Sequence, residues 1–313
     1  MSAGTRIGAF GAALALLFAG ATVAGGAIKP HGESPAAKDD DRGGHASAPG
    51  DEQMKASEHT EQAPTAAHGA QSHPVRGLAV AEDGLRVVVN DAELRRGQAE
   101  NLCFRIVDER GATVRDFDVE HERRLHLIVA RRDLTGFQHL HPEQAPDGSW
   151  STELRVDEAG SYRLFADFSH EGTPQTLATD LRVDGSADPR PLPPPEADAV
   201  SDGDYDVHLD AGRAHPGREA ELRFTITRDG VPVATEPYLG AGGHLVALRE
   251  GDLAFLHVHP TEHGHGKATP SGEQDDSVGF AATFPTEGRY RLFLQFKHEG
   301  RVQTVAFTQA VAR

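Results

Sequence analysis

Beyond residue 76 the hydrophobic positions come in short runs separated by turn-forming residues, and no segment keeps a helical apolar period for three turns. In several runs every second residue is apolar, which is typical of strands with one buried face. The first half of this region predicts strands near 85–90, 100–107, 124–131, 136–141, 150–156, 161–168 and 175–183. About seven short strands in roughly a hundred residues indicate an immunoglobulin-like β-sandwich.

The pattern occurs twice in the chain. His126, His139 and His141 recur 118 residues later as His244, His257 and His259. His170 recurs as His298, each within a Phe-x-His-Glu-Gly segment. A repeat of this length predicts an all-β protein with two tandem immunoglobulin-like β-sandwich domains, at 77–183 and 203–313.

The alternation of apolar and polar residues also predicts which faces of the strands are buried. Leu102, Phe104 and Ile106 match Leu222, Phe224 and Ile226 of the second repeat. The aromatic and aliphatic residues at positions 162, 164, 166 and 168 match those at 290, 292, 294 and 296. Because alternate side chains of a strand share a face, we expect these residues to form the two cores.

The remaining segments have different compositions. Segment 184–202 contains Pro189, Pro191 and the run 193–195, which predicts an extended, semi-rigid linker. Segment 29–76 has almost no large apolar residues and predicts a disordered, histidine-containing linker. Residues 1–28 carry an uncharged apolar run after Arg6, as in a cleaved secretory signal or a single-pass N-terminal membrane anchor. Both alternatives predict an extracytoplasmic location.

Net charge and cysteine content exclude several classes of partner and metal site. The net charge of −17 argues against nucleic acid and anionic membrane surfaces as partners. A single cysteine excludes an internal disulfide framework and a multi-thiolate zinc or iron–sulfur site within one chain. Metal ions and cell-envelope proteins remain as candidate partners.

The repeated histidines suggest a metal site in each repeat. If 124–131 and 136–141 form a hairpin turning at 132–133, His126 lies opposite His139, and His141 shares their face. A turn at 250–251 would place His244 opposite His257 in the same way, with His259 beside them. Imidazole nitrogens arranged like this suit copper(II) or zinc.

Each site gains a fourth ligand if the sandwich has the expected strand order. The strand at 161–168 would pair with the strand of His126, so that His170, and His298 in the second repeat, fall at the same end of the sandwich. We expect the second site to be the stronger, because His263 and His265 lie in a loop near it.

Other interpretations of the histidines stay open. Each could be a hydrogen-bonded structural residue, and His170 and His298 could be turn residues. Five further histidines, at positions 31, 45, 59, 68 and 73, are either solvated or weak metal-binding groups. Partial matches to cupin and copper–zinc superoxide dismutase motifs lack the second cupin motif and the zinc loop respectively.

The segment from Arg131 to Pro142 (Arg-Arg-Asp-Leu-Thr-Gly-Phe-Gln-His-Leu-His-Pro), together with Phe165-Ala-Asp-Phe168, resembles a group of secreted or membrane-anchored actinobacterial proteins of the heavy-metal (copper)-associated type. The resemblance implies metal handling outside the cytoplasm. It also implies a histidine two residues before His126, where this chain has Arg124.

These observations predict an extracytoplasmic metal-binding carrier, buffer or sensor that holds copper(II) or zinc. The expected ligands are His126, His139, His141, His170, His244, His257, His259 and His298. No catalytic residue is expected, because a site whose four positions are filled by histidine has no place for substrate. The alternatives are a non-metal adhesion or scaffold module of the cell envelope and a cupin- or superoxide-dismutase-like metalloenzyme.

Overall fold

The computed structural model describes residues 75–256, 258–261 and 276–313. All regular structure in these ranges is β, which confirms the predicted all-β class. The predicted signal or anchor at 1–28 and nearly all of the predicted linker at 29–76 lie outside the described residues. Within the described part, no helix is long and apolar enough to cross a membrane.

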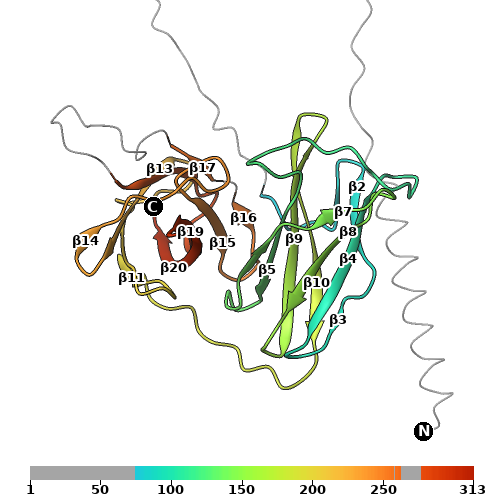
Figure 1. Ribbon diagram of the computed structural model, residues 1–313, viewed down its shortest axis with the longest axis horizontal. Coiled ribbons are helices and arrows are strands. Elements are labelled where there is room, and N and C mark those ends of the chain that lie inside the picture. Colours follow the sequence, from blue (N-terminus) through green and yellow to red (C-terminus); the bar gives the residue numbers. More distant parts are fainter. Residues whose placement is uncertain (1–74, 257, 262–275) are drawn as a thin grey trace, which may run out of the picture. The chain divides into compact units, whose positions relative to one another are not determined.

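The first repeat forms a sandwich of two five-stranded sheets (Figure 1). One sheet has the order β1 (Ala81–Glu82), β2 (Leu85–Val89), β4 (Ala99–Val107), β8 (Trp150–Arg155) and β7 (Glu143–Gln144). The other has the order β3 (Glu93–Leu94), β10 (Thr173–Val183), β9 (Gly160–His170), β5 (His126–Arg131) and β6 (Gln138–Leu140). β3 is parallel to β10, and the other pairs are antiparallel.

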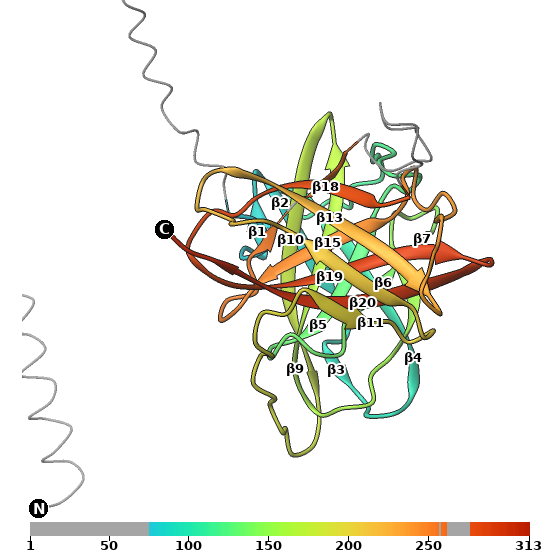
Figure 2. The same cartoon turned by 90° about the vertical axis from the view of Figure 1, so that its left-hand side faces the viewer.

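The second repeat builds an equivalent sandwich, whose long strands cross the view of Figure 2. One sheet contains β11 (Asp198–Val200), β12 (Asp206–Asp210), β13 (Glu219–Arg228), β18 (Val278–Thr283) and β17 (His259–Pro260), with β14 (Val231–Pro232) beside β13. The other has the order β16 (Phe255–Leu256), β15 (His244–Arg249), β19 (Gly288–His298) and β20 (Arg301–Val311). β11 thus begins this sandwich inside the segment predicted as linker.

The two cores confirm the predicted alternation. All the core positions named from the sequence are buried, those of the first repeat in one apolar cluster and those of the second in another. Each sandwich also has a tyrosine at the start of its penultimate strand whose hydroxyl donates to a main-chain oxygen four residues upstream: Tyr162 to Glu158 at 2.8 Å, and Tyr290 to Thr286 at 3.0 Å. This tyrosine corner and the strand order make both sandwiches immunoglobulin-like.

A third apolar cluster lies between the sandwiches, which belong to one compact unit spanning Ala67–Arg313. It joins the outer faces of β5 and β9 to the outer faces of β15 and β19. The rings of Phe137 and Phe293 stack with centroids 4.1 Å apart, and those of Phe165 and Phe255 are 5.6 Å apart. The linker contributes Leu192, which is buried in the same cluster.

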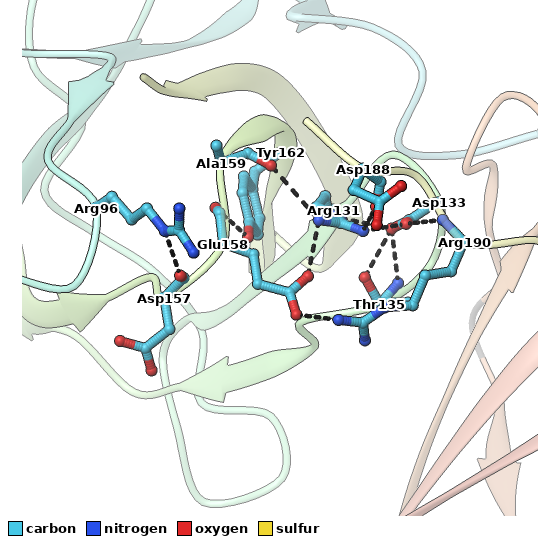
Figure 3. Close-up of polar contacts among 10 residues, drawn as sticks. All are labelled: Arg96, Arg131, Asp133, Thr135, Asp157, Glu158, Ala159, Tyr162, Asp188 and Arg190. Atoms are coloured by element: carbon cyan, nitrogen blue, oxygen red, sulfur yellow. Dashed lines mark hydrogen bonds and ion pairs between the residues drawn. The ribbon is translucent and has the colours of Figure 1, made fainter. Parts of the chain in front are cut away.

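A buried arginine at the end of β5 fixes the turn that follows it (Figure 3). The guanidinium of Arg131 pairs with Asp133 in the turn and lies 2.7 Å from Glu158. It also donates to the main-chain oxygen of Asp188 at 2.8 Å, which ties the linker to the first sandwich. Arg190 continues the network to Glu158. The turn that leads into β6, the strand of His139, is therefore anchored to the first sandwich.

Candidate metal centre

The hairpin of β5 and β6 has a register different from the predicted one. His139 is paired with Ile128 and Leu140 with Leu127, so His126 is not directly opposite His139. The reason is the length of the turn. It spans residues 132–137, more than the predicted two-residue turn, because the pair of Arg131 and Asp133 stabilises a wider loop. A shift of two residues keeps every side chain on its face, so His126 and His139 still share the outer face of the sheet.

Three histidines of the first repeat lie together at the end of this hairpin. His126, His139 and His141 each offer a ring nitrogen, and these nitrogens all lie within 4.8 Å of one another. His126 is buried, with 4% of its surface exposed, and the other two are half-buried. The arrangement suits one metal ion, because three nitrogens at ~2.0–2.1 Å from a common centre must lie a few ångströms apart.

The hydrogen bonds of two of these rings bear on where their lone pairs point. His126 Nε2 lies 3.3 Å from the main-chain oxygen of Glu120, and His139 Nδ1 lies 2.6 Å from Oε1 of Gln295. Nδ1 of His126 and Nε2 of His139 face each other at 3.0 Å, and a proton on either nitrogen would make this contact a hydrogen bond. In the tautomers that donate to Glu120 and Gln295, neither facing nitrogen has a proton. In those tautomers a cation between the two rings would relieve the repulsion of their lone pairs.

The third ring supplies another unpaired acceptor. His141 Nε2 is buried and has no hydrogen-bond partner among the described residues. A buried polar atom without a partner normally costs free energy, which a bound metal ion would relieve. Gln295 also fits a metal site, since ligating histidines usually donate their second N–H to a carbonyl or carboxylate.

Burial keeps these histidines uncharged at neutral pH. Desolvation lowers the pKa of His126 to about 3, with further lowering from His139. Desolvation lowers the pKa of His139 and that of His141 to about 4. Since only the unprotonated ring binds a metal, the cluster is ready to bind without first losing protons.

The second repeat does not reproduce this arrangement. β15 pairs with β16 through Ala247 with Leu256 and Leu248 with Phe255, a register two residues from the one expected for this hairpin. His259 is exposed and pairs with Ala281 in the opposite sheet, away from β15. His257, His263 and His265 lie outside the described residues.

His244 lies instead in the cluster of the first repeat. Its ring centroid is 4.7 Å from that of His139 and 5.5 Å from that of His126. Burial lowers the pKa of His244 well below its usual range, and the neighbouring His139 adds to the effect. The sequence predicts His244 in a separate site of the second repeat, whereas in the structure it lies beside the histidines of the first repeat.

His170 and His298 are not part of the cluster, contrary to the expected convergence at one end of each sandwich. β5 and β9 do pair as predicted, with His126 beside Asp167. His170 is three residues further along, an odd number, so its side chain leaves the opposite face of the sheet. Its Nδ1 bonds to the main-chain oxygen of Asp116 at 2.8 Å, and His298 Nδ1 bonds to the hydroxyl of Tyr205 at 2.8 Å.

Two residues near the cluster were not predicted from the sequence. His121 has its ring centroid 6.2 Å from that of His126 and 6.0 Å from that of His244. The repeat gives no signal for it, because the second repeat has no matching histidine. Its backbone has a φ of 48°, and Glu122 has a φ of 65°, so a strained turn places this ring beside the cluster. Gln295 offered no signal, because a glutamine in a strand is common.

Comparison with protein families gives two matches along the chain. A family described as a domain of unknown function (DUF8832) matches residues 79–185 and 198–313. The chain belongs to this family. The two DUF8832 matches coincide with the two sandwiches, so each sandwich is one copy of the domain. A search of curated protein sequences found no match.

Solved structures with similar folds are distant. The Escherichia coli adhesin FdeC is 16% identical, with 75% of this chain and 66% of that chain covered and a TM-score of 0.26. A Salmonella alpha-2-macroglobulin is 15% identical, with 77% and 15% covered and a TM-score of 0.26. The adhesin InvE of Yersinia pseudotuberculosis is 11% identical, with 72% and 58% covered and a TM-score of 0.21. The chain thus spans less than two thirds of the length of these three proteins.

Proposed function

We propose that this DUF8832 protein binds a divalent transition-metal ion, copper(II) or zinc, through His126, His139 and His141. The observation that carries the proposal is the approach of one ring nitrogen from each of the three histidines to within 4.8 Å of one another, with those of His126 and His139 facing each other at 3.0 Å. The buried, unpartnered Nε2 of His141 supports it further. Ligands that are all imidazole suit both ions, and copper(II) binds more strongly than zinc to most sites.

The biological role that we propose is that of an extracytoplasmic carrier, buffer or sensor. The uncharged apolar run at 7–28 supports export. Buried imidazoles on paired strands form a rigid site, which favours retention of an ion over its rapid exchange. We expect no enzymatic turnover.

A second candidate is a non-metal adhesion or scaffold module of the cell envelope. The tandem immunoglobulin-like architecture favours it, because many cell-surface proteins are built from such sandwiches. In that case the histidines would be polar residues of the contact between the sandwiches. The architecture supports this candidate and the histidine cluster supports the first, so metal binding decides between them.

The test is calorimetric titration of the full chain with zinc and with copper(II), alongside a variant in which the five histidines at positions 31–73 are alanine. We expect both proteins to bind one ion at the cluster with a Kd well below millimolar, and His139→Ala to lose this binding. Binding no tighter than roughly millimolar corresponds to only about −4 kcal/mol and would favour the scaffold. If only the variant without the histidines at positions 31–73 lost binding, the ion would be bound by the linker at 29–76.

A further inference from the structure

We propose that the metal site is shared between the two sandwiches, with His244 of the second repeat as its fourth ligand, so that the bound ion links the two domains. This inference rests on the proposed function. It makes the contact between the sandwiches part of the site.

The first argument is the distance between the rings. Four imidazoles bound tetrahedrally at ~2.0–2.1 Å would have ring centroids about 5 Å apart. In the protein, the centroid of His126 is 5.2 Å from that of His139 and 5.2 Å from that of His141. His139 and His141 are 4.7 Å apart, and His244 is 4.7 Å from His139 and 5.5 Å from His126. These five distances agree with the spacing expected for a tetrahedral four-histidine site.

The second argument is that the second sandwich already orients a ligand of the first. Gln295 on β19 is paired with His244 on β15, and its side-chain oxygen accepts the N–H of His139. Its amide nitrogen lies 3.2 Å from Oγ1 of Thr304, which helps to hold the side chain in place. One neighbouring pair of the second sandwich thus offers a ligand and a supporting hydrogen bond to the same ion.

The third argument is the apolar contact beside the site. His126 and Ile128 are on the outer face of β5, and His244 and Val246 are on the outer face of β15. Ile128 and Val246 belong to the apolar cluster between the sandwiches, so the same contact that buries them brings His244 to the histidines of the first repeat. His244 is not among the three residues whose nitrogens lie within 4.8 Å of one another. Its ring must turn or advance when the ion binds, and this movement would draw the two sheets together.

A fourth protein ligand changes what the site can do. Three histidines leave one position open for water or substrate, as in many catalytic zinc sites, whereas four close the coordination shell. A closed site shared between two domains suits storage or sensing, because occupancy changes how firmly the domains are joined.

Cobalt(II) as a spectroscopic probe tests the proposal on the full chain. Four-coordinate cobalt(II) absorbs visible light more strongly than five- or six-coordinate cobalt(II), and azide alters the spectrum only when a position is open. We expect the unaltered protein to give intense bands that azide does not change. In His244→Ala and His244→Asn we expect cobalt affinity to fall at least tenfold and the bands to shift with azide. The asparagine variant keeps a polar side chain of moderate size, and circular dichroism establishes that both variants are folded.

His259→Ala is the matched control, since this repeated histidine lies on the other sheet. It should leave both affinity and azide response unchanged. If both His244 variants match the unaltered protein in affinity and azide response, the shared site is wrong, while metal binding by the first sandwich stands. If the unaltered protein binds no cobalt, both proposals fail.

Discussion

The two histidine hairpins share their sequence spacing and their strand register, yet they place their histidines differently. Val129 pairs with Gln138 in the first repeat, and the equivalent Ala247 pairs with Leu256 in the second. The difference comes after the hairpin. In the first repeat the chain stays in the sheet as far as Leu140 and joins the opposite sheet at Glu143. In the second it joins the opposite sheet at His259.

The chain therefore joins the opposite sheet two residues earlier in the second repeat. His141 remains beside His126, whereas His259 is carried to the far sheet. A preserved spacing thus fixes which residues are available, while the point at which the chain changes sheets decides which of them meet. The first repeat supplies three members of one cluster, and the second supplies His244 and Gln295.

The largest effect on stability is expected where the two sandwiches touch. Phe293→Ala removes a buried ring that stacks on Phe137. Large-to-small changes of this kind cost about 3–5 kcal/mol, and denaturant unfolding measures the loss. Val302→Ala on the exposed part of β20 is the control and should have little effect. If Phe293→Ala were as mild as Val302→Ala, the sandwiches would not be packed against each other in solution.

The pH dependence of stability should reveal the buried histidines. Their folded-state pKa values of about 3 to 4 lie below the unfolded value of about 6.5, so the unfolded chain takes up protons first as the pH falls. Stability of the metal-free protein should therefore be full above about pH 6.5 and decrease towards pH 4. Asp167, whose pKa burial raises to about 6, acts in the opposite direction but is a single group.

Unfolding free energies measured between pH 7 and pH 4 test this dependence. His126→Asn together with His139→Asn should give a shallower slope in that range, because two of the shifted groups are gone. A slope that is unchanged in this double variant would mean that the histidine cluster is not the source of the acid sensitivity.

A smaller effect is expected at Gln295, which contacts His139 Nδ1 and is not one of the proposed ligands. Changes to such supporting residues typically cost ~10–100-fold in metal affinity. Gln295→Ala should show a loss of this size by calorimetry, and Gln295→Glu should restore much of it, because a carboxylate also accepts the N–H of His139. If alanine and glutamate variants bind equally well, the hydrogen bond does not orient the ligand.

The smallest effect on stability is expected at the two tyrosine corners. Tyr162→Phe and Tyr290→Phe each remove one hydroxyl that donates to the main chain, and each should cost about 0.5–1.5 kcal/mol of unfolding free energy. Because the corners have the same geometry, the two losses should be similar. A large difference between them would show that the sandwiches differ in more than the course of the chain after the hairpin.

The fold could be predicted because alternation, turn residues and the repeat all indicate the same sandwich. The contact between sandwiches was not predicted, although the sequence carried a signal for it. The run Leu127–Ala130 is apolar at every position, and β5 is buried on both faces. A continuous apolar run indicates a strand covered on both sides, whereas the prediction counted only one buried face.

The site could be predicted only in part. The spacing of the first three histidines placed them on one face, and a wider turn moved the register by two residues without changing that face. The presence of His244 in the same cluster depends on how one sandwich packs against the other, which residue spacing within a repeat does not encode. His121 has no counterpart in the second repeat, so the repeat does not indicate it.

The most direct test of the central claim is the number of metal ions bound per chain. The protein used is the zinc-loaded full chain in which the five histidines at positions 31–73 are replaced by alanine. Elemental analysis should find one ion per chain. The count should remain one in His259→Ala and fall to zero in the combined His126→Ala and His139→Ala variant. Two ions per chain would contradict a single shared cluster, and an unchanged count in the double variant would contradict its location.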